Sequence, residues 1–244
     1  FGEIYEQIPE LPFCNIWTAM QLSSRLPKGA LFHMGVSNTR RCWNMFQLPE
    51  SVESACNVGC CGIDGCVSTL VGASLVNPDR LCYVVVGDLT FFYDLNSLGN
   101  HHIGTNLRVM LVNNGRGTEF RLGIHHCNVF GDDADKYMAA AGHFGNKSPL
   151  LVKHYAEDLG FHYLSATTKE EFMTALSNFT NPQLSDHSMI LEVFTDSKDE
   201  SEALYLMSHI QSDAKGMVRS KLKDAVRNVA GEKGINAIKK ILKK

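Results

Sequence analysis

The sequence has no long hydrophobic run. Every apolar stretch stops well short of the ~20 residues that a helix needs to cross a bilayer, which excludes an ordinary membrane span. The first residues, Phe1-Gly2-Glu3-Ile4, also lack the basic and apolar regions of a secretory signal peptide. Because the chain starts at Phe rather than Met, we expect it to be a piece of a longer polypeptide.

Standard metal-binding cysteine pairs are also missing. Eight cysteines are present, but the cluster at Cys56, Cys60, Cys61 and Cys66 contains no C-x-x-C pair of the zinc type. The ten histidines are scattered, and adjacent pairs of them point to different faces of an element. We therefore expect buried free thiols, which suit a reducing cytosol, and a cytoplasmic protein.

The composition is that of an ordinary globular protein, with 44% hydrophobic and 20% charged residues. A chain of 244 residues is long enough for a large α/β domain with its own core. The charge is uneven: residues 215–244 hold ten Lys or Arg against two acidic residues, a balance of +8, so the rest carries −11. This shift predicts a main domain over 1–200 and a separate segment over 201–244.

The basic segment has apolar residues at helical spacing, with Gly231 and Gly234 marking a break. This pattern predicts two amphipathic basic helices. We favour docking of these helices on the acidic body or on a sister subunit over contact with an anionic membrane surface. We expect no nucleic acid as a partner, because the body is acidic and no base-reading motif is present.

Strand and helix patterns alternate along the rest of the chain. Strands are predicted at 30–34, 81–86, 107–112, 161–164 and 189–195, and helices at 15–26, 63–75, 90–102, 149–159 and 169–179. This alternation predicts an α/β fold with a parallel sheet and helices on both faces.

Two of these strands end in residues suited to a metal and a phosphate. The strand at 81–86 stops at Gly87-Asp88-Leu89-Thr90, and the strand at 107–112 stops at Asn113-Asn114-Gly115-Arg116-Gly117. A crossover helix between them brings Asp88 and Asn114 to one sheet edge, where hard oxygen ligands suit Mg²⁺ and the helix start suits phosphate. The alternative is a plain βαβ unit with an N-cap Asp and an Asn-Gly turn.

Together, 26 residues apart, the two motifs resemble those of the thiamine-diphosphate-dependent enzymes, whose pattern is Gly-Asp-Gly, about two dozen residues, then Asn-Asn. The resemblance implies that Asp88, Asn114 and the Arg116 carbonyl hold Mg²⁺ on the cofactor diphosphate, beside Gly87 and Leu89. Leu89 stands where the pattern has its third Gly, a departure shared by the menaquinone-pathway carboligases of this family. With varying strength, the resemblance runs from about Asn15 to about Asp196.

A second segment resembles the same carboligases. Gly59-Cys60-Cys61-Gly62-Ile63-Asp64-Gly65, followed by Ser68-Thr69, is similar to their Gly-x-x-Gly-Ile-Asp-Gly-x-x-Ser-Thr segment. The resemblance implies that Ile63 bends the cofactor, that the Cys61 carbonyl lies near its aminopyrimidine, and that Gly62 also belongs to the cofactor-binding residues. From the residues themselves, the segment is also compatible with plain packing at a helix entrance.

A third segment, Ser37-Asn38-Thr39-Arg40-Arg41, follows the first predicted strand. The resemblance implies that Ser37 and Arg41 hold a substrate carboxylate, and the two side chains make a chemically reasonable anion clamp. The alternative is an N-cap serine followed by a solvated arginine.

Two positions depart from the carboligase pattern. The chain has Asn57-Val58-Gly59 where the carboligases have Asn-Arg-Gly, and Glu119 where they have an apolar residue that lines the pocket. Because a cation is lost and a carboxylate gained, we expect a substrate with fewer carboxylates than theirs. We expect Glu119 to contact the substrate as well.

The sequence therefore predicts the diphosphate-binding domain of a thiamine-diphosphate-dependent 2-oxo acid decarboxylase or carboligase. In this family an activating Glu lies on a pyrimidine-binding domain, of which this sequence holds no copy, so we expect a homo-oligomer such as a dimer and no activity from the chain alone. The alternative is a noncatalytic scaffold subunit that retains the fold. A nucleotide-binding domain is disfavoured because neither Gly-x-Gly-x-x-Gly nor a Walker loop is present.

Overall fold

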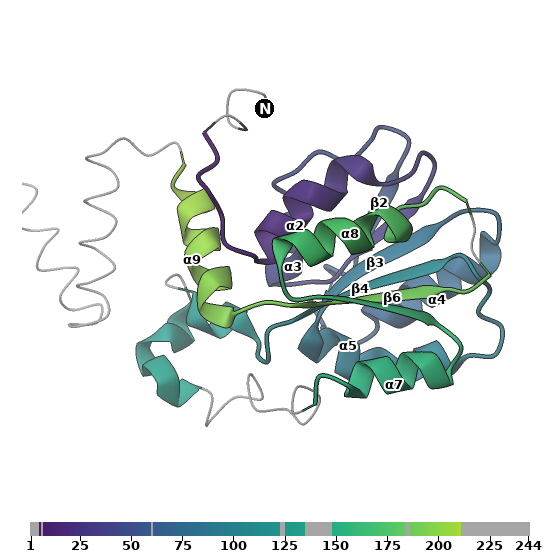
Figure 1. Ribbon diagram of the computed structural model, residues 1–244. Helices are drawn as coiled ribbons and strands as arrows, with labels where there is room; N and C mark the ends of the chain where they lie inside the picture. Colours follow the sequence, from purple (N-terminus) through teal and green to yellow (C-terminus); the bar gives the residue numbers. More distant parts are fainter. Residues whose placement is uncertain are drawn as a thin grey trace, which may run out of the picture.

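The computed structural model describes residues 5, 7–59, 61–122, 125–134, 148–183 and 186–210. At its centre is a sheet of six parallel strands in the order β2-β1-β3-β4-β6-β5 (Figure 1). The strands are β1 (Leu31–Met34), β2 (Glu53–Cys56), β3 (Cys82–Gly87), β4 (Leu107–Asn113), β5 (His162–Ala166) and β6 (Met189–Phe194).

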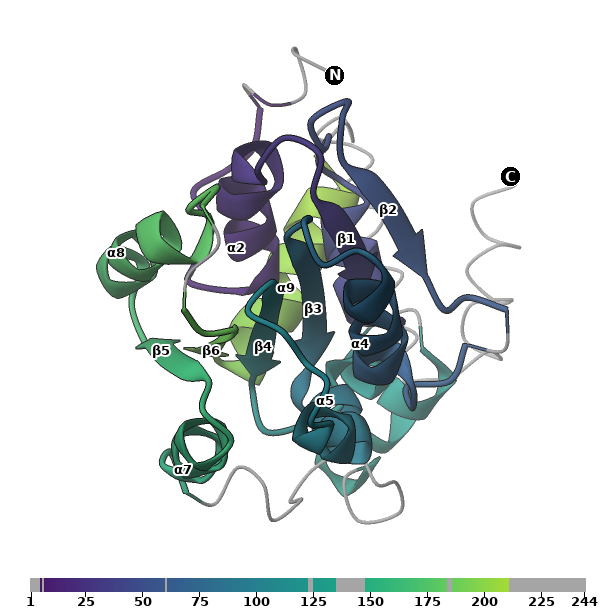
Figure 2. The ribbon, with the colours of Figure 1, turned by 90° about the vertical axis from the view of Figure 1, so that its right-hand side faces the viewer.

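Helices cover both faces of the sheet, which confirms the predicted fold (Figures 1 and 2). One face packs against α2 (Asn15–Leu22), α3 (Asn38–Trp43), α8 (Lys169–Phe179) and α9 (Ser197–Ser208). The other face packs against α4 (Cys66–Val76), α5 (Asp88–Asp94) and α7 (Leu151–Asp158).

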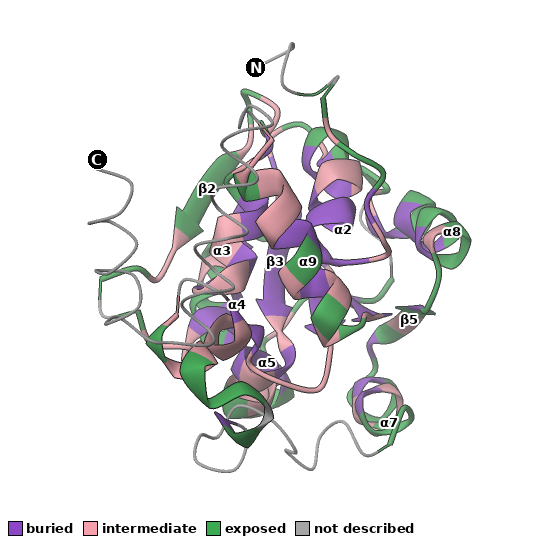
Figure 3. Ribbon diagram, turned by 90° about the vertical axis from the view of Figure 1, so that its left-hand side faces the viewer, coloured by how far each residue is buried: buried purple, intermediate pink, exposed green. Residues whose placement is uncertain are grey.

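The central strands are apolar on both sides because each side meets a helical layer. In β3, Tyr83 and Val85 join the core under α2 and α8, whereas Val84 and Val86 join the core over α4 and α5. β3 is buried up to its last residue, the half-buried Gly87, whereas β2 at the edge is exposed up to its last residue, Cys56 (Figure 3). The continuous apolar runs in the sequence thus mark the middle of the sheet.

Most predicted elements are present, with shifted ends. The helix predicted at 15–26 ends as the 3₁₀ turn η1 (Ser23–Arg25), and the helix predicted at 90–102 is α5 followed by η2 (Leu95–Gly99). The helix predicted from residue 63 starts at Cys66, because Gly65 before it has a φ of +86°. Three short or polar elements, α3, β2 and α9, were missed by the pattern.

The C-terminal part of the described chain is helical. α9 runs across the predicted domain border at residue 200 and buries Ala203 and Leu204 in the core, while the border itself stays a prediction. The two basic helices predicted within 215–244 lie outside the described residues. Within the described ranges, no helix is both long and apolar enough to cross a membrane.

Candidate functional site

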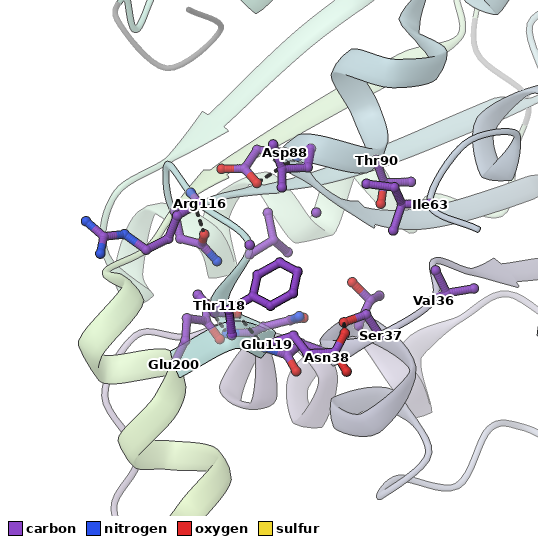
Figure 4. Close-up of a pocket in the computed structure, with 18 residues that line it drawn as sticks. Val36, Ser37, Asn38, Ile63, Asp88, Thr90, Arg116, Thr118, Glu119 and Glu200 are labelled. Carbon is purple, nitrogen blue, oxygen red and sulfur yellow. Dashed lines mark hydrogen bonds between the residues drawn. The ribbon is translucent and has the colours of Figure 1, made fainter. Parts of the chain in front are cut away.

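A pocket opens where the central strands end (Figure 4). Its empty volume is about 660 Å³, including space open to solvent. Eight of the predicted site residues line it: Ser37, Ile63, Gly87, Asp88, Leu89, Asn114, Arg116 and Glu119. The fold therefore gathers segments that are far apart in the sequence at one place.

Asp88 and Asn114 follow the ends of two neighbouring strands. β3 pairs with β4 in parallel register, with Gly87 opposite Val112, so the residues just beyond emerge at the same sheet edge. The Asp88 side chain is only 2% exposed, and its Oδ1 accepts a hydrogen bond from the Leu89 N–H at 2.7 Å. Both residues line the pocket.

The two asparagines at the end of β4 have different roles. Asn114 accepts the Arg116 N–H on its Oδ1 at 3.2 Å, an Asx turn that fixes the side chain at the pocket. Asn113 instead donates to Glu192 Oε1 at 2.7 Å, and Glu192 also accepts the Tyr163 hydroxyl at 2.7 Å. Only the second asparagine of the motif therefore lines the pocket.

The segment between β2 and α4 contributes Ile63 to the pocket. Asn57 holds this segment against α4, because its Nδ2 donates to the Gly65 carbonyl at 3.2 Å and to Thr69 Oγ1 at 3.1 Å. Cys61 is exposed, and neither Cys61 nor Gly62 lines the pocket. Val58, at the position of the missing arginine, is 43% exposed and also lies off the pocket lining.

Ser37, Arg41 and Glu119 form one hydrogen-bonded cluster. Arg41 Nη2 lies 2.7 Å from Glu119 Oε1, and the Ser37 hydroxyl donates to Glu119 Oε2. Arg41 Nη1 also donates to Asn38 Oδ1 at 3.2 Å. The arginine is therefore not a solvated helix charge, and the serine hydroxyl does not cap α3.

The charge of Glu119 is stabilised in this cluster. Burial raises the pKa of its carboxyl, but hydrogen bonds from Ser37 and Arg41, together with the charge of Arg41, outweigh burial, so the pKa is lowered. Glu119 is therefore a carboxylate at neutral pH and is unsuited to donating a proton. The predicted clamp for a substrate carboxylate holds a carboxylate of the chain itself.

Backbone strain is confined to two of the predicted site residues. Among the described residues, Ser37 (φ +64°) and Cys61 (φ +53°) are the only non-glycine residues with positive φ. Such a conformation is unfavourable for a side chain with a Cβ and is typically kept at functional positions. Both fall in segments that the sequence predicts to contact cofactor or substrate.

Glu200 was not predicted from the sequence. It lies on α9, is buried, and lines the pocket; its Oε1 accepts the Asn15 N–H at 2.9 Å and the Thr195 hydroxyl at 2.6 Å. Burial raises the pKa of this carboxyl to about 7, and the charges of Asp199 and Asp88 add to the effect. Asp196, just after β6, is a residue type typical of a helix start. Nothing in the sequence indicates that Glu200, four residues later, faces the interior.

A cluster of metal-binding side chains is absent from the part of the chain that the structure describes, where no three His, Cys, Asp or Glu residues are grouped to hold an ion. The described members of the cysteine cluster, Cys56, Cys61 and Cys66, are free thiols, of which only Cys66 is buried. The predicted magnesium ligands do not depend on such a cluster, because they combine one carboxylate with an amide and a backbone carbonyl.

Comparison with known proteins gives one consistent result. The chain is 34% identical over 196 residues to the 2-succinyl-5-enolpyruvyl-6-hydroxy-3-cyclohexene-1-carboxylate synthase of Bacteroides fragilis, covering 80% of this chain and 34% of that protein. The predicted resemblance is confirmed. The synthase of Phocaeicola vulgatus is 34% identical over 200 residues (81% of this chain, 34% of the synthase), and that of Christiangramia forsetii 33% over 199 residues (82% and 33%).

The chain spans about a third of the length of these synthases. No family model matches it. The similarity therefore concerns about one third of each synthase.

Proposed function

We propose that this chain is the part of a thiamine-diphosphate-dependent 2-oxo acid decarboxylase or carboligase that binds the cofactor diphosphate through Mg²⁺. Asp88, Asn114 and the Arg116 carbonyl hold the ion, and Gly87 and Leu89 adjoin the diphosphate. Ile63, on the segment between β2 and α4, supports the cofactor. The Cys61 carbonyl lies toward the aminopyrimidine of the cofactor, and Gly62 adjoins it. The similarity to the synthases supports this assignment of class.

The observation that carries the proposal is the shared position of Asp88 and Asn114 at the ends of β3 and β4, in one pocket with Ile63. Their carboxylate and amide oxygens are hard donors, the kind that Mg²⁺ takes while keeping water and phosphate as further ligands. The space around Gly87 also fits a bound group, because a Cβ at this position would meet nothing within 4 Å. The residues present therefore suit a metal-bound diphosphate.

Bound thiamine diphosphate supplies carbanion chemistry on 2-oxo acids. In the proposal the residues of this chain bind and orient: Asp88 and Asn114 would hold the ion, whose positive charge would offset that of the diphosphate, and Ile63 adds an apolar contact. The activating Glu comes from a pyrimidine-binding domain of the same or a sister chain, in a cytoplasmic homo-oligomer. The chain by itself is then inactive.

The experiment is an equilibrium titration of thiamine diphosphate into the complete protein, by calorimetry, with Mg²⁺ or with EDTA. We expect saturable binding that requires Mg²⁺ and a rise in melting temperature with ligand concentration, because the ligand binds only the folded state. Absence of binding in both conditions favours the alternative, a noncatalytic subunit that retains the fold. As a control, Asp158→Asn on the exposed end of α7 should bind like the wild type.

A further inference from the structure

We infer, given the proposed function, that Glu119 is an internal ligand of the anion clamp formed by Ser37 and Arg41, and that it excludes a second carboxylate of the substrate from the pocket. The site then accepts 2-oxo acids whose chain beyond the keto acid is uncharged. Glu119 thereby determines specificity within the proposed reaction.

The first support is that both oxygens of Glu119 are used by the clamp. Oε1 pairs with Arg41 Nη2 at 2.7 Å, and Oε2 accepts the Ser37 hydroxyl. The Arg41 Nη1 donates to Asn38 Oδ1 at 3.2 Å. This is the bonding that a bound carboxylate would make with the same donors.

The second support is that the chain fixes Glu119 in place. It lies on η3 (Thr118–Arg121), and its neighbour Thr118 accepts a hydrogen bond from Asn38 on the first turn of α3. Packing on the other side is tight, because a Cβ at Gly117 would lie 3.1 Å from Leu89 Cδ1 and 3.4 Å from a Phe120 ring atom. The backbone of Glu119 is therefore held beside Ser37 and Arg41 by its own segment.

The third support is electrostatic. The charged residues that line the pocket are Asp88, Glu119 and Glu200, all acidic, and Arg116. A substrate carboxylate at the clamp would have to displace Glu119 and leave two negative groups beside one arginine, which is unfavourable. The Glu119 pKa is lowered despite burial, so protonation does not release the clamp at neutral pH.

The test uses succinate as a probe of the clamp, titrated by calorimetry into the complete protein without cofactor. The variants are Glu119→Ile, Glu119→Gln, and Glu119→Ile combined with Arg41→Ala. We expect Glu119→Ile to bind succinate about tenfold or more tightly than the wild type, equivalent to recovering one charge-assisted hydrogen bond. Adding Arg41→Ala should abolish the gain.

The Glu119→Gln variant and one control variant keep the test decisive. Glu119→Gln retains the shape but not the charge and should show a smaller gain, so it replaces Glu119→Ile if that variant fails to fold. Glu53→Gln removes another carboxylate paired with an arginine, at 2.8 Å from Arg80, on the edge strand β2 and off the pocket lining. It should leave succinate binding unchanged.

With Mg²⁺ and thiamine diphosphate present, Glu119→Ile should also raise the preference for 2-oxoglutarate over pyruvate about tenfold. If the folded Glu119 variants bind succinate no better than the wild type, or if the gain survives Arg41→Ala, the inference is wrong. Failure of the proposed function is a separate result, because the wild-type protein would then not bind thiamine diphosphate. The succinate titration is done without cofactor and would still test the clamp.

Discussion

Arg41 and Glu119 lie 78 residues apart in the sequence and pair at 2.7 Å, with Glu119 lining the pocket and Arg41 behind it, outside the lining. The pair joins α3, just after β1, to η3, just after β4, so it links the ends of two strands that are not neighbours in the sheet. Both side chains are about one third exposed or less. The link is therefore partly shielded from solvent and should contribute measurably to stability.

Replacing Arg41 by Ala should lower the free energy of unfolding by about 1 kcal/mol at pH 7, the scale of a half-buried ion pair. Because the Glu119 pKa is lowered in the folded state, this contribution is present above the ordinary value of 4.5 and is lost as the pH falls through the folded pKa. Urea unfolding of wild type and variant from pH 3 to 8 measures it. If wild type and variant differ in free energy of unfolding by the same amount down to pH 3, the Arg41–Glu119 pair is not the cause of that difference.

The strained backbone at Ser37 gives a second prediction. Ser37→Ala and Ser37→Gly both lose the hydroxyl that donates to Glu119, but only Gly adopts a φ of +64° without cost. We expect the Gly variant to be more stable than the Ala variant by about 0.5–1 kcal/mol. At Ser177, exposed on the regular helix α8, the order should reverse. Thermal unfolding of the four variants decides this; Ala above Gly at both positions would mean that Ser37 is unstrained.

Glu200 makes stability depend on pH. Its folded pKa, raised by burial to about 7 from an ordinary 4.5, means that the folded state holds a proton that the unfolded state has lost. Stability should therefore fall as the pH rises from about 4.5 to about 7 and then level off, by on the order of 3 kcal/mol.

Glu200→Gln should remove this pH dependence and stabilise the protein above pH 7. Both hydrogen bonds from Asn15 and Thr195 go to Oε1, which a Gln side chain keeps. Chemical denaturation at pH 4.5, 6 and 8 measures the effect. Parallel pH profiles for the variant and the wild type would contradict it.

Much of the fold could be predicted because its central strands carry a strong signal. β3 and β4 must be apolar on both sides, so they appear in the sequence as unbroken hydrophobic runs whose ends mark Asp88 and Asn114. β2 was missed because an exposed edge strand of four residues has no such run. The early start predicted for α4 came from Ile63, which is apolar because it lines the pocket rather than because it is helical.

The site was predictable only in part, for a related reason. Motif spacing places Ser37, Ile63, Asp88 and Asn114 at one sheet edge, but which side chains bond to each other depends on the path of the loops. The bonding of Glu119 to Ser37 and Arg41 follows from the turn at η3, which no periodic pattern reveals. The inward position of Glu200 likewise depends on how α9 packs against α2.

The central claim is that Asp88 and Asn114 hold the same ion. Their strands end side by side, so the two ligands should act as a unit rather than independently. The most direct test is a double-mutant cycle on the Mg²⁺ dissociation constant, measured with thiamine diphosphate present, for Asp88→Asn, Asn114→Ala and the double variant of the complete protein.

We predict that each single variant weakens Mg²⁺ binding about 10- to 100-fold, no less than the loss caused by removing a hydrogen-bonding partner of a metal ligand. The double variant should bind Mg²⁺ little more weakly than the weaker-binding of the two single variants. Asp158→Asn should bind Mg²⁺ like the wild type. Unchanged Mg²⁺ binding in either single variant, or losses that add fully in the double variant, would contradict a shared ion at this sheet edge.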